Sequence, residues 1–181
     1  MSSQSRFRVF LSAVLAATFV VATAGAANAY TLTGTKWSSS SVTITVNVST
    51  TNGSYHTAAV NAVSNWSSST DVNMTRTSSS LFKALIVADG ENGLHGRAVW
   101  SSSGGRTTAA TAYLNTTTTS RFKTNENRLR AIWSHEIGHG LGLGHVSSSS
   151  YIMYTCPSCV YTSYGYYTPR SDDRAGMNYL Y

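Results

Sequence analysis

Three of the five histidines of this chain lie within a segment of 11 residues, and this segment restricts the chain more than any other. Residues 135–145 read HEIGHGLGLGH, which fits the pattern H-E-x-x-H-x-x-G-x-x-H. In a helix, His135 and His139 lie on one face, so both imidazoles can bind one cation. Because five positions are fixed, a chance match is expected on the order of once in ten million starting residues. The pattern therefore predicts a zinc site.

Gly142 marks the predicted end of this helix, since glycine readily takes the left-handed conformation that turns the chain. The turn brings back His145 as a third nitrogen ligand. Three protein ligands leave one position of a tetrahedral zinc open, which is the arrangement of catalytic sites. Glu136 is rotated too far around the helix to reach the metal, but it can reach a water bound there. We therefore interpret Glu136 as the general base.

An ordinary amphipathic helix with exposed histidines is the alternative interpretation. It leaves unexplained the four glycines at positions 138, 140, 142 and 144, where a helix would favour alanine. The remaining histidines, His56 and His95, are expected to be solvent-exposed or bonded to neighbours, because three histidines already complete the site.

The first 29 residues are predicted to be a secretory signal peptide. Arg6 and Arg8 precede an apolar run at 9–21, and residues 27–29 (Ala-Asn-Ala) have the small-x-small form of a cleavage site. Residues 30–181 are then one domain, which we expect to be secreted and extracellular. No later segment is long and apolar enough to span a membrane.

The charges of the predicted mature domain argue against nucleic acid as a partner. The signal peptide contains two of the 13 Lys and Arg residues and none of the 7 Asp and Glu residues. The remaining charges are scattered, with no dense basic run. We therefore do not expect nucleic acid as a partner. We also expect a monomer with no membrane partner.

The two cysteines, Cys156 and Cys159, are separated by Pro-Ser and are predicted to form a local disulfide in an oxidising compartment. A redox motif would need a thioredoxin-like context, and a cysteine-based zinc site would need two further ligands.

Hydrophobic periodicity predicts an α+β fold. An early helix is expected at 56–66, a long helix from the N-cap pair Thr124-Asn125 to about Leu141, and a terminal helix from Thr168 through Leu180. The strands of a twisted mixed sheet are expected at 42–48, 72–75, 82–88, 94–100 and 109–115, with loops at 101–106 and 116–119.

Features along most of this domain resemble the metzincin clan of zinc metallopeptidases, and within it the matrixin family, in its bacterial type without a propeptide. They are Lys36-Trp37 before an alternating strand, Trp66-Ser67 at the end of a helix, the strand and loop at 85–93, the strand at 112–115, Met153-Tyr154 at the position of the methionine turn, and Asp172-Asp173 with Gly176 and Tyr181 in the closing helix.

The resemblance implies a zinc-dependent endopeptidase that hydrolyses protein or peptide substrates with one catalytic zinc. Glu136 would take a proton from the attacking water and pass it to the leaving amine. Met153 would form a packing floor beneath the zinc, whereas Tyr154 would either line the site or pack. The strand at 94–100 would pair with an extended substrate.

Three departures from the family pattern concern the surroundings of the site. Val146 follows the third histidine, where matrixins have Ser or Thr, and Thr155-Cys156-Pro157 replaces the Pro-x-Tyr wall of the specificity pocket. The loop at 89–95 lacks the histidine and aspartate set of a second, structural zinc, so that zinc is not expected. Loop carbonyls allow calcium binding, but nothing in the sequence demands it.

Two further functional hypotheses remain open at this stage. The chain could be a secreted zinc-binding module without catalysis, although Glu136 at the base position disfavours this. It could also be a zinc hydrolase of non-peptide bonds, because zinc-activated water is general in its chemistry.

Overall fold

The structure of the protein is a computed structural model, and it describes residues 29–181. The predicted signal peptide lies outside the described residues, except for Ala29. Within the described part, no helix has the length and apolar character needed to cross a membrane.

One five-stranded sheet forms the base of the molecule, with the strand order β2-β1-β3-β5-β4. The strands are β1 (Ser41–Asn47), β2 (Asn73–Arg76), β3 (Phe82–Val87), β4 (Gly96–Ser103) and β5 (Arg106–Asn115). Only β4 runs antiparallel to its neighbour, while the other neighbours pair in parallel. The predicted α+β fold with a mixed sheet is confirmed, and the antiparallel strand lies at its edge.

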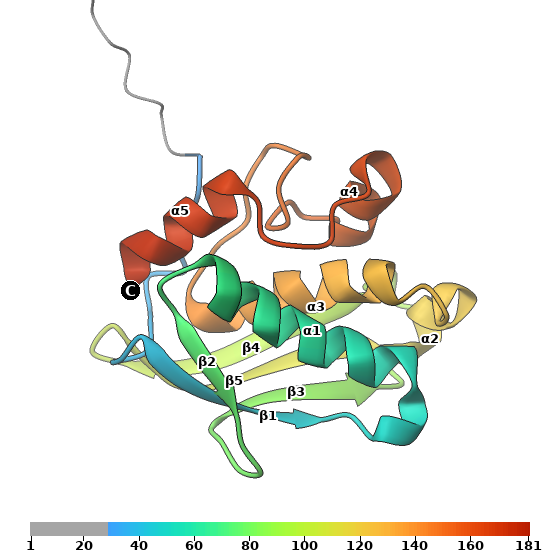
Figure 1. Ribbon diagram of the computed structural model, residues 1–181, viewed down its shortest axis with the longest axis horizontal. Helices are drawn as coiled ribbons and strands as arrows, with labels where there is room; N and C mark the ends of the chain where they lie inside the picture. The colour runs from blue at the N-terminus through green and yellow to red at the C-terminus, as the bar shows by residue number, and fades with distance from the viewer. Residues whose placement is uncertain (1–28) are drawn as a thin grey trace, which may run out of the picture.

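The helices gather on one side of this sheet. They are α1 (Ser54–Ser69), α2 (Thr116–Thr119), α3 (Glu126–Leu141), α4 (Pro157–Tyr164) and α5 (Ser171–Leu180), with short 3₁₀ turns at Thr50–Asn52 and Ser120–Phe122. Helices α1 and α3 cover the sheet, and α4 and α5 lie beyond them, on the side away from the strands (Figure 1). The early, long and terminal helices predicted from the sequence are therefore present.

The core lies between the sheet and the helices α1 and α3. Ala110, Ala112 and Leu114 alternate along β5 and are buried, as a strand with one covered face requires. Trp66, the predicted core anchor, is fully buried, and its Nε1 donates to the carbonyl oxygen of Ser134 at 3.0 Å. This bond joins the end of α1 to α3.

The prediction of a loop at 101–106 is wrong, because β4 and β5 form a tight hairpin there. Only Gly104 and Gly105 form the turn, with φ angles of 55° and 75°. Two successive residues with positive φ match the twist of a two-residue hairpin, and glycine adopts them without strain. The three serines before the turn belong to the exposed edge strand.

Two helices are missing from the sequence prediction. The threonines at 116–119 form α2 rather than a loop, because the side chain of Asn115 caps the backbone N–H of Thr117 at 3.0 Å. Helix α4 lies in the segment expected only to be an aromatic tail. Pro157 at its start and Gly165 after its end, at φ 70°, are the flanking signals of a helix.

Both ends of α3 agree with the sequence. The Asn125 side chain accepts a bond from the backbone N–H of Arg128 at 3.1 Å. At the other end, Gly142 has φ 117°, and its N–H donates to the carbonyl oxygens of Gly138 and His139. The helix thus ends where the predicted turn begins.

Gly140 allows α3 to lie close to the sheet. A Cβ atom at this position would lie 2.6 Å from Cε2 of Phe82, whose buried ring stacks on Trp37 at 5.9 Å between centroids. The Trp37 Nε1 in turn donates to the Gly140 carbonyl oxygen at 3.0 Å. The neighbouring rings therefore leave no room for a methyl group.

We expect Gly140→Ala to lower the free energy of unfolding by about 1–3 kcal/mol, because the Phe82 ring cannot move aside without disturbing its packing. Helix propensity alone has the opposite sign, favouring alanine by about 1 kcal/mol. Urea denaturation of the two proteins measures the difference. A more stable variant would show that propensity outweighs the close packing of α3 on the sheet.

Candidate metal centre

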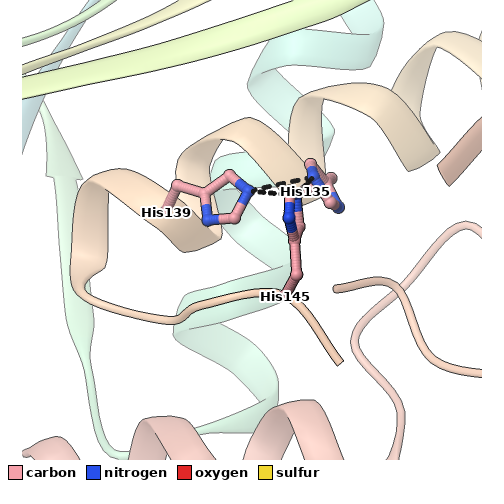
Figure 2. A group of neighbouring side chains, drawn as sticks. All are labelled: His135, His139 and His145. Atoms are coloured by element: carbon pink, nitrogen blue, oxygen red, sulfur yellow. Dashed lines mark hydrogen bonds between the residues drawn. The ribbon is translucent and has the colours of Figure 1, made fainter. Parts of the chain in front are cut away.

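Three imidazoles from α3 and the segment after it converge on one point. His135 and His139 project from α3, and His145 comes from the chain after the Gly142 turn (Figure 2). Their Nε2 atoms lie 3.0 Å (135–139), 3.1 Å (139–145) and 3.2 Å (135–145) apart. The structure therefore brings the three predicted ligands together in a nearly regular triangle, as a group able to hold a metal ion.

Backbone carbonyls orient two of these rings. The Nδ1 atom of His135 lies 2.8 Å from the carbonyl oxygen of Ile152, and that of His139 lies 2.7 Å from the carbonyl oxygen of Leu143. Because a carbonyl oxygen can only accept, both Nδ1 atoms must carry the proton. Each neutral ring then presents a lone pair at Nε2, which is the form that binds a metal.

The local environment keeps these rings neutral. Burial lowers the pKa of His135 well below its usual value, and the charge that His139 would carry adds to the effect. Burial also lowers the pKa of His139, to about 4, and that of His145, which is the most exposed of the three. Neutral imidazoles are therefore favoured at neutral pH. A metal can then bind without displacing a proton from His135 or His139.

The triangle fits zinc. Three nitrogens bound tetrahedrally at roughly 2.0–2.1 Å from zinc lie about 3.3 Å apart, close to the separations found here. The Nε2 atoms of His135 and His139 both carry lone pairs and have no proton to share, so their 3.0 Å contact leaves two acceptors facing each other. A cation at this point would satisfy all three lone pairs.

Glu136 lies next to the triangle and is almost fully buried. Burial raises the pKa of its carboxyl group to about 8. A dication held by the histidines would act in the opposite direction, because a nearby positive charge favours the carboxylate. A Cβ atom at Gly96, in β4, would lie 2.7 Å from the Glu136 Oε1 atom, so the carboxyl group occupies space that only glycine leaves open.

Asp173 holds the backbone segment that orients His135, a contribution that sequence reasoning missed. Its buried carboxylate accepts from the backbone N–H of Ile152 at 2.9 Å and of Met153 at 3.0 Å. The carbonyl of Ile152 is the group that orients His135. Helix α5 is thereby connected to His135 through Ile152 alone.

Met153 lies directly beneath α3 in the structure. It is 1% exposed, and a Cβ atom at Gly138 would lie 2.6 Å from its Sδ atom. Tyr154 is half-buried and packs against both apolar clusters of the protein. It is not among the side chains that line the cleft described next, which favours packing over lining.

An open cleft of about 510 Å³ leads to the histidines. Its lining includes the start of β4 with the residues before it, from Gly93 to Ala98, together with Trp100 and Thr155-Cys156-Pro157. Cys156 and Cys159 form a disulfide at the start of α4, so a disulfide lies at the wall where the sequence departs from the family pattern. Trp100 stacks beside His139, with centroids 6.5 Å apart.

The other two histidines lie outside the triangle. The Nδ1 atom of His56 lies 2.6 Å from the carbonyl oxygen of Val48, far along the chain from the centre. His95 lines the cleft instead, and its Nε2 atom accepts from Nη2 of Arg121 at 3.2 Å. Sequence reasoning could not predict this contact, because its partners are 26 positions apart in the chain.

Comparison with known proteins gives one family. The model of the peptidase M10 family, described as matrixin, matches residues 36–181, which include all three histidines, Glu136 and the methionine turn. No curated protein matches the chain.

We expect Asp173→Asn to lower the free energy of unfolding by about 2–3 kcal/mol and to weaken zinc binding about tenfold or more, because the amide cannot accept the same set of backbone bonds and His135 loses its support. Chemical denaturation and competition with a zinc indicator measure the two effects. Asp71→Asn, at an exposed position, is the matched control. Unchanged zinc affinity in Asp173→Asn would contradict the coupling.

Proposed function

We propose that this chain, which belongs to the matrixin family of metalloproteases, is a secreted zinc-dependent endopeptidase. The observation that carries the proposal is the convergence of three imidazole Nε2 atoms within 3.2 Å of one another, next to a buried carboxyl group and at the floor of an open cleft. Three ligands with one open coordination position are typical of a catalytic zinc.

His135, His139 and His145 would hold the metal. Bound there, zinc supplies a Lewis acid that polarises the scissile carbonyl and lowers the pKa of an attacking water from about 15.7 towards roughly 7. The carbonyls of Ile152 and Leu143 keep two of the rings in the tautomer that binds metal. The histidines thus hold the metal in a fixed position, and they transfer no proton themselves.

Glu136 would move the proton. Its carboxylate takes the proton of the attacking water and delivers it to the leaving amine, first as a general base and then as a general acid. Its position supports this role, because Glu136 is the one carboxylic acid among the residues that line the cleft with the three histidines. Gly96 leaves the space that the carboxyl group needs.

The edge strand β4 would bind the substrate backbone. It is the outermost strand of the sheet, and its side chains are exposed or half-buried along its whole length. An extended peptide can add to such an edge through main-chain hydrogen bonds, which places it in the cleft and across the histidines. This mode suits a peptide bond within a chain, as an endopeptidase requires.

Glu136→Gln is expected to retain one bound zinc and to lose casein cleavage by about 10²–10⁴-fold, because the amide keeps the shape of the side chain but cannot accept the proton. Elemental analysis measures the zinc, and release of labelled casein fragments measures the activity, each with and without a chelator. Glu91→Gln, in an exposed loop, is the matched control.

Near-full activity of Glu136→Gln would contradict the role of this residue. Bound zinc without cleavage in either protein would favour a zinc-binding module or a hydrolase of non-peptide bonds. The same elemental analysis reports any bound calcium.

Export can be tested separately. When the full chain is produced in a secreting host, we expect the protein in the medium to begin at Tyr30, because the small residues Ala27 and Ala29 favour cleavage there. Terminal sequencing by mass spectrometry checks this. An intact amino-terminal segment on protein retained in the cells would contradict the signal peptide.

A further inference from the structure

Two arginine side chains lie near His95, a residue of the cleft lining. His95, which lines the cleft, accepts from Nη2 of Arg121 at 3.2 Å. The His95 ring also meets the edge of Phe122, with centroids 5.3 Å apart, and the guanidinium of Arg128 lies 4.0 Å from the centroid of the same Phe122 ring. Arg121 thus bonds to a cleft residue, and Arg128 lies over the aromatic ring that touches the same residue.

These two guanidinium groups lack an acidic partner. The ion pairs among residues 29–181 are Arg97 with Asp89, at 3.3 Å, and Arg130 with Glu126, at 3.9 Å. The Nε atom of Arg128 is buried without a hydrogen-bond partner. The pKa of Arg128 is lowered by burial and by the charge of Arg121, so the two groups repel each other in the folded protein.

The cleft itself offers almost no negative charge near this cluster. Among its lining residues Glu136 is the only carboxylic acid, and that side chain is buried beside the histidines. Arg97, the one arginine of the lining, is already paired with Asp89. Lys123 adds a further exposed positive charge beside Phe122. An incoming anion would therefore meet a positive potential at this end of the cleft.

We propose that His95, Arg121 and Arg128 form a subsite for a carboxylate side chain of the substrate, so that this enzyme prefers to cut near Asp or Glu. The inference rests on the proposed function and adds a substrate class to it. A bound carboxylate would relieve the repulsion between the two guanidinium groups and accept their N–H donors, as Arg pairs with carboxylates elsewhere.

A structural role alone would not produce this preference. If Arg128 only covers Phe122, its removal would lower stability and affect all substrates alike. Selectivity between substrates that differ by one charge therefore separates the two roles.

The test uses the mature, zinc-loaded protein. Profiling of a peptide library first gives a cleaved sequence, and synthetic peptides then carry Glu, Gln or Lys at each position beside the cut. Their carboxyl termini are amidated, so that a side chain is the only source of the carboxylate. The ratio of kcat/KM between the Glu and Gln peptides is the measured quantity.

At one position we expect this ratio to be about five, a size typical of a partly exposed pair of charges, and the Lys peptide to be cut more slowly than the Gln peptide. In the double variant that combines Arg121→Gln with Arg128→Gln, the ratio of kcat/KM between the Glu and Gln peptides should fall towards one. The matched control, Arg76→Gln with Arg106→Gln, removes two exposed charges elsewhere and should keep the ratio. If the double variant does not fold, Arg121→Gln alone, at an exposed position, should still lower the ratio.

Two results would overturn the subsite. One is a Glu-to-Gln ratio of kcat/KM of one or less at every position in the wild type. The other is a preference for the Glu peptide that persists both in the double variant and in Arg121→Gln alone. Neither result would contradict the proposed endopeptidase function, because the neutral peptides would still be cut. Failure to cut any peptide would instead overturn the proposed function, and the subsite with it.

Discussion

Three neutral imidazole nitrogens face one another at the histidine cluster, within 3.2 Å. Lone pairs at Nε2 of His135 and His139, 3.0 Å apart, are unfavourable without a cation between them, so the surrounding structure has to hold the rings in place. It does so through rigid attachments. Helix α3 fixes two rings, the left-handed turn at Gly142 returns the third, and the carbonyls of Ile152 and Leu143 orient the first two. A preorganised site of this kind loses little conformational freedom when the metal binds.

The packing around α3 follows from this requirement. Gly138 allows Met153 to lie directly beneath the helix, and Gly140 allows the Phe82 ring of the sheet to approach it. Gly96 on β4 leaves room for the carboxyl group of Glu136. The two helical glycines, Gly138 and Gly140, therefore bring Met153 and the sheet close to α3, and Gly96 does the same for the edge strand. The cost in helix propensity, about 1 kcal/mol for each helical glycine, is offset by this close packing.

The sequence predicted the parts of the site that depend on local spacing. These parts belong to a single helix, and each agrees with the prediction: the spacing of His135 and His139, the cap at Asn125 and the turn at Gly142. It did not predict the contacts that tertiary structure creates. Arg121 meets His95 across 26 positions, and Asp173 reaches Ile152 across 21. The hairpin at Gly104-Gly105 and helix α4 were missed for a different reason, because polar and aromatic composition concealed turn and cap signals that were present.

X-ray absorption at the zinc edge reports which atoms surround the metal, so it examines the three-histidine centre itself. For the zinc-loaded protein, we expect three imidazole nitrogens at roughly 2.0–2.1 Å and a light fourth ligand, with no sulfur in the first coordination sphere. Replacing His145 with alanine should reduce the imidazole contribution to two. Sulfur scattering at about 2.3 Å, or a spectrum unchanged by loss of His145, would contradict a centre built from the three converging histidines.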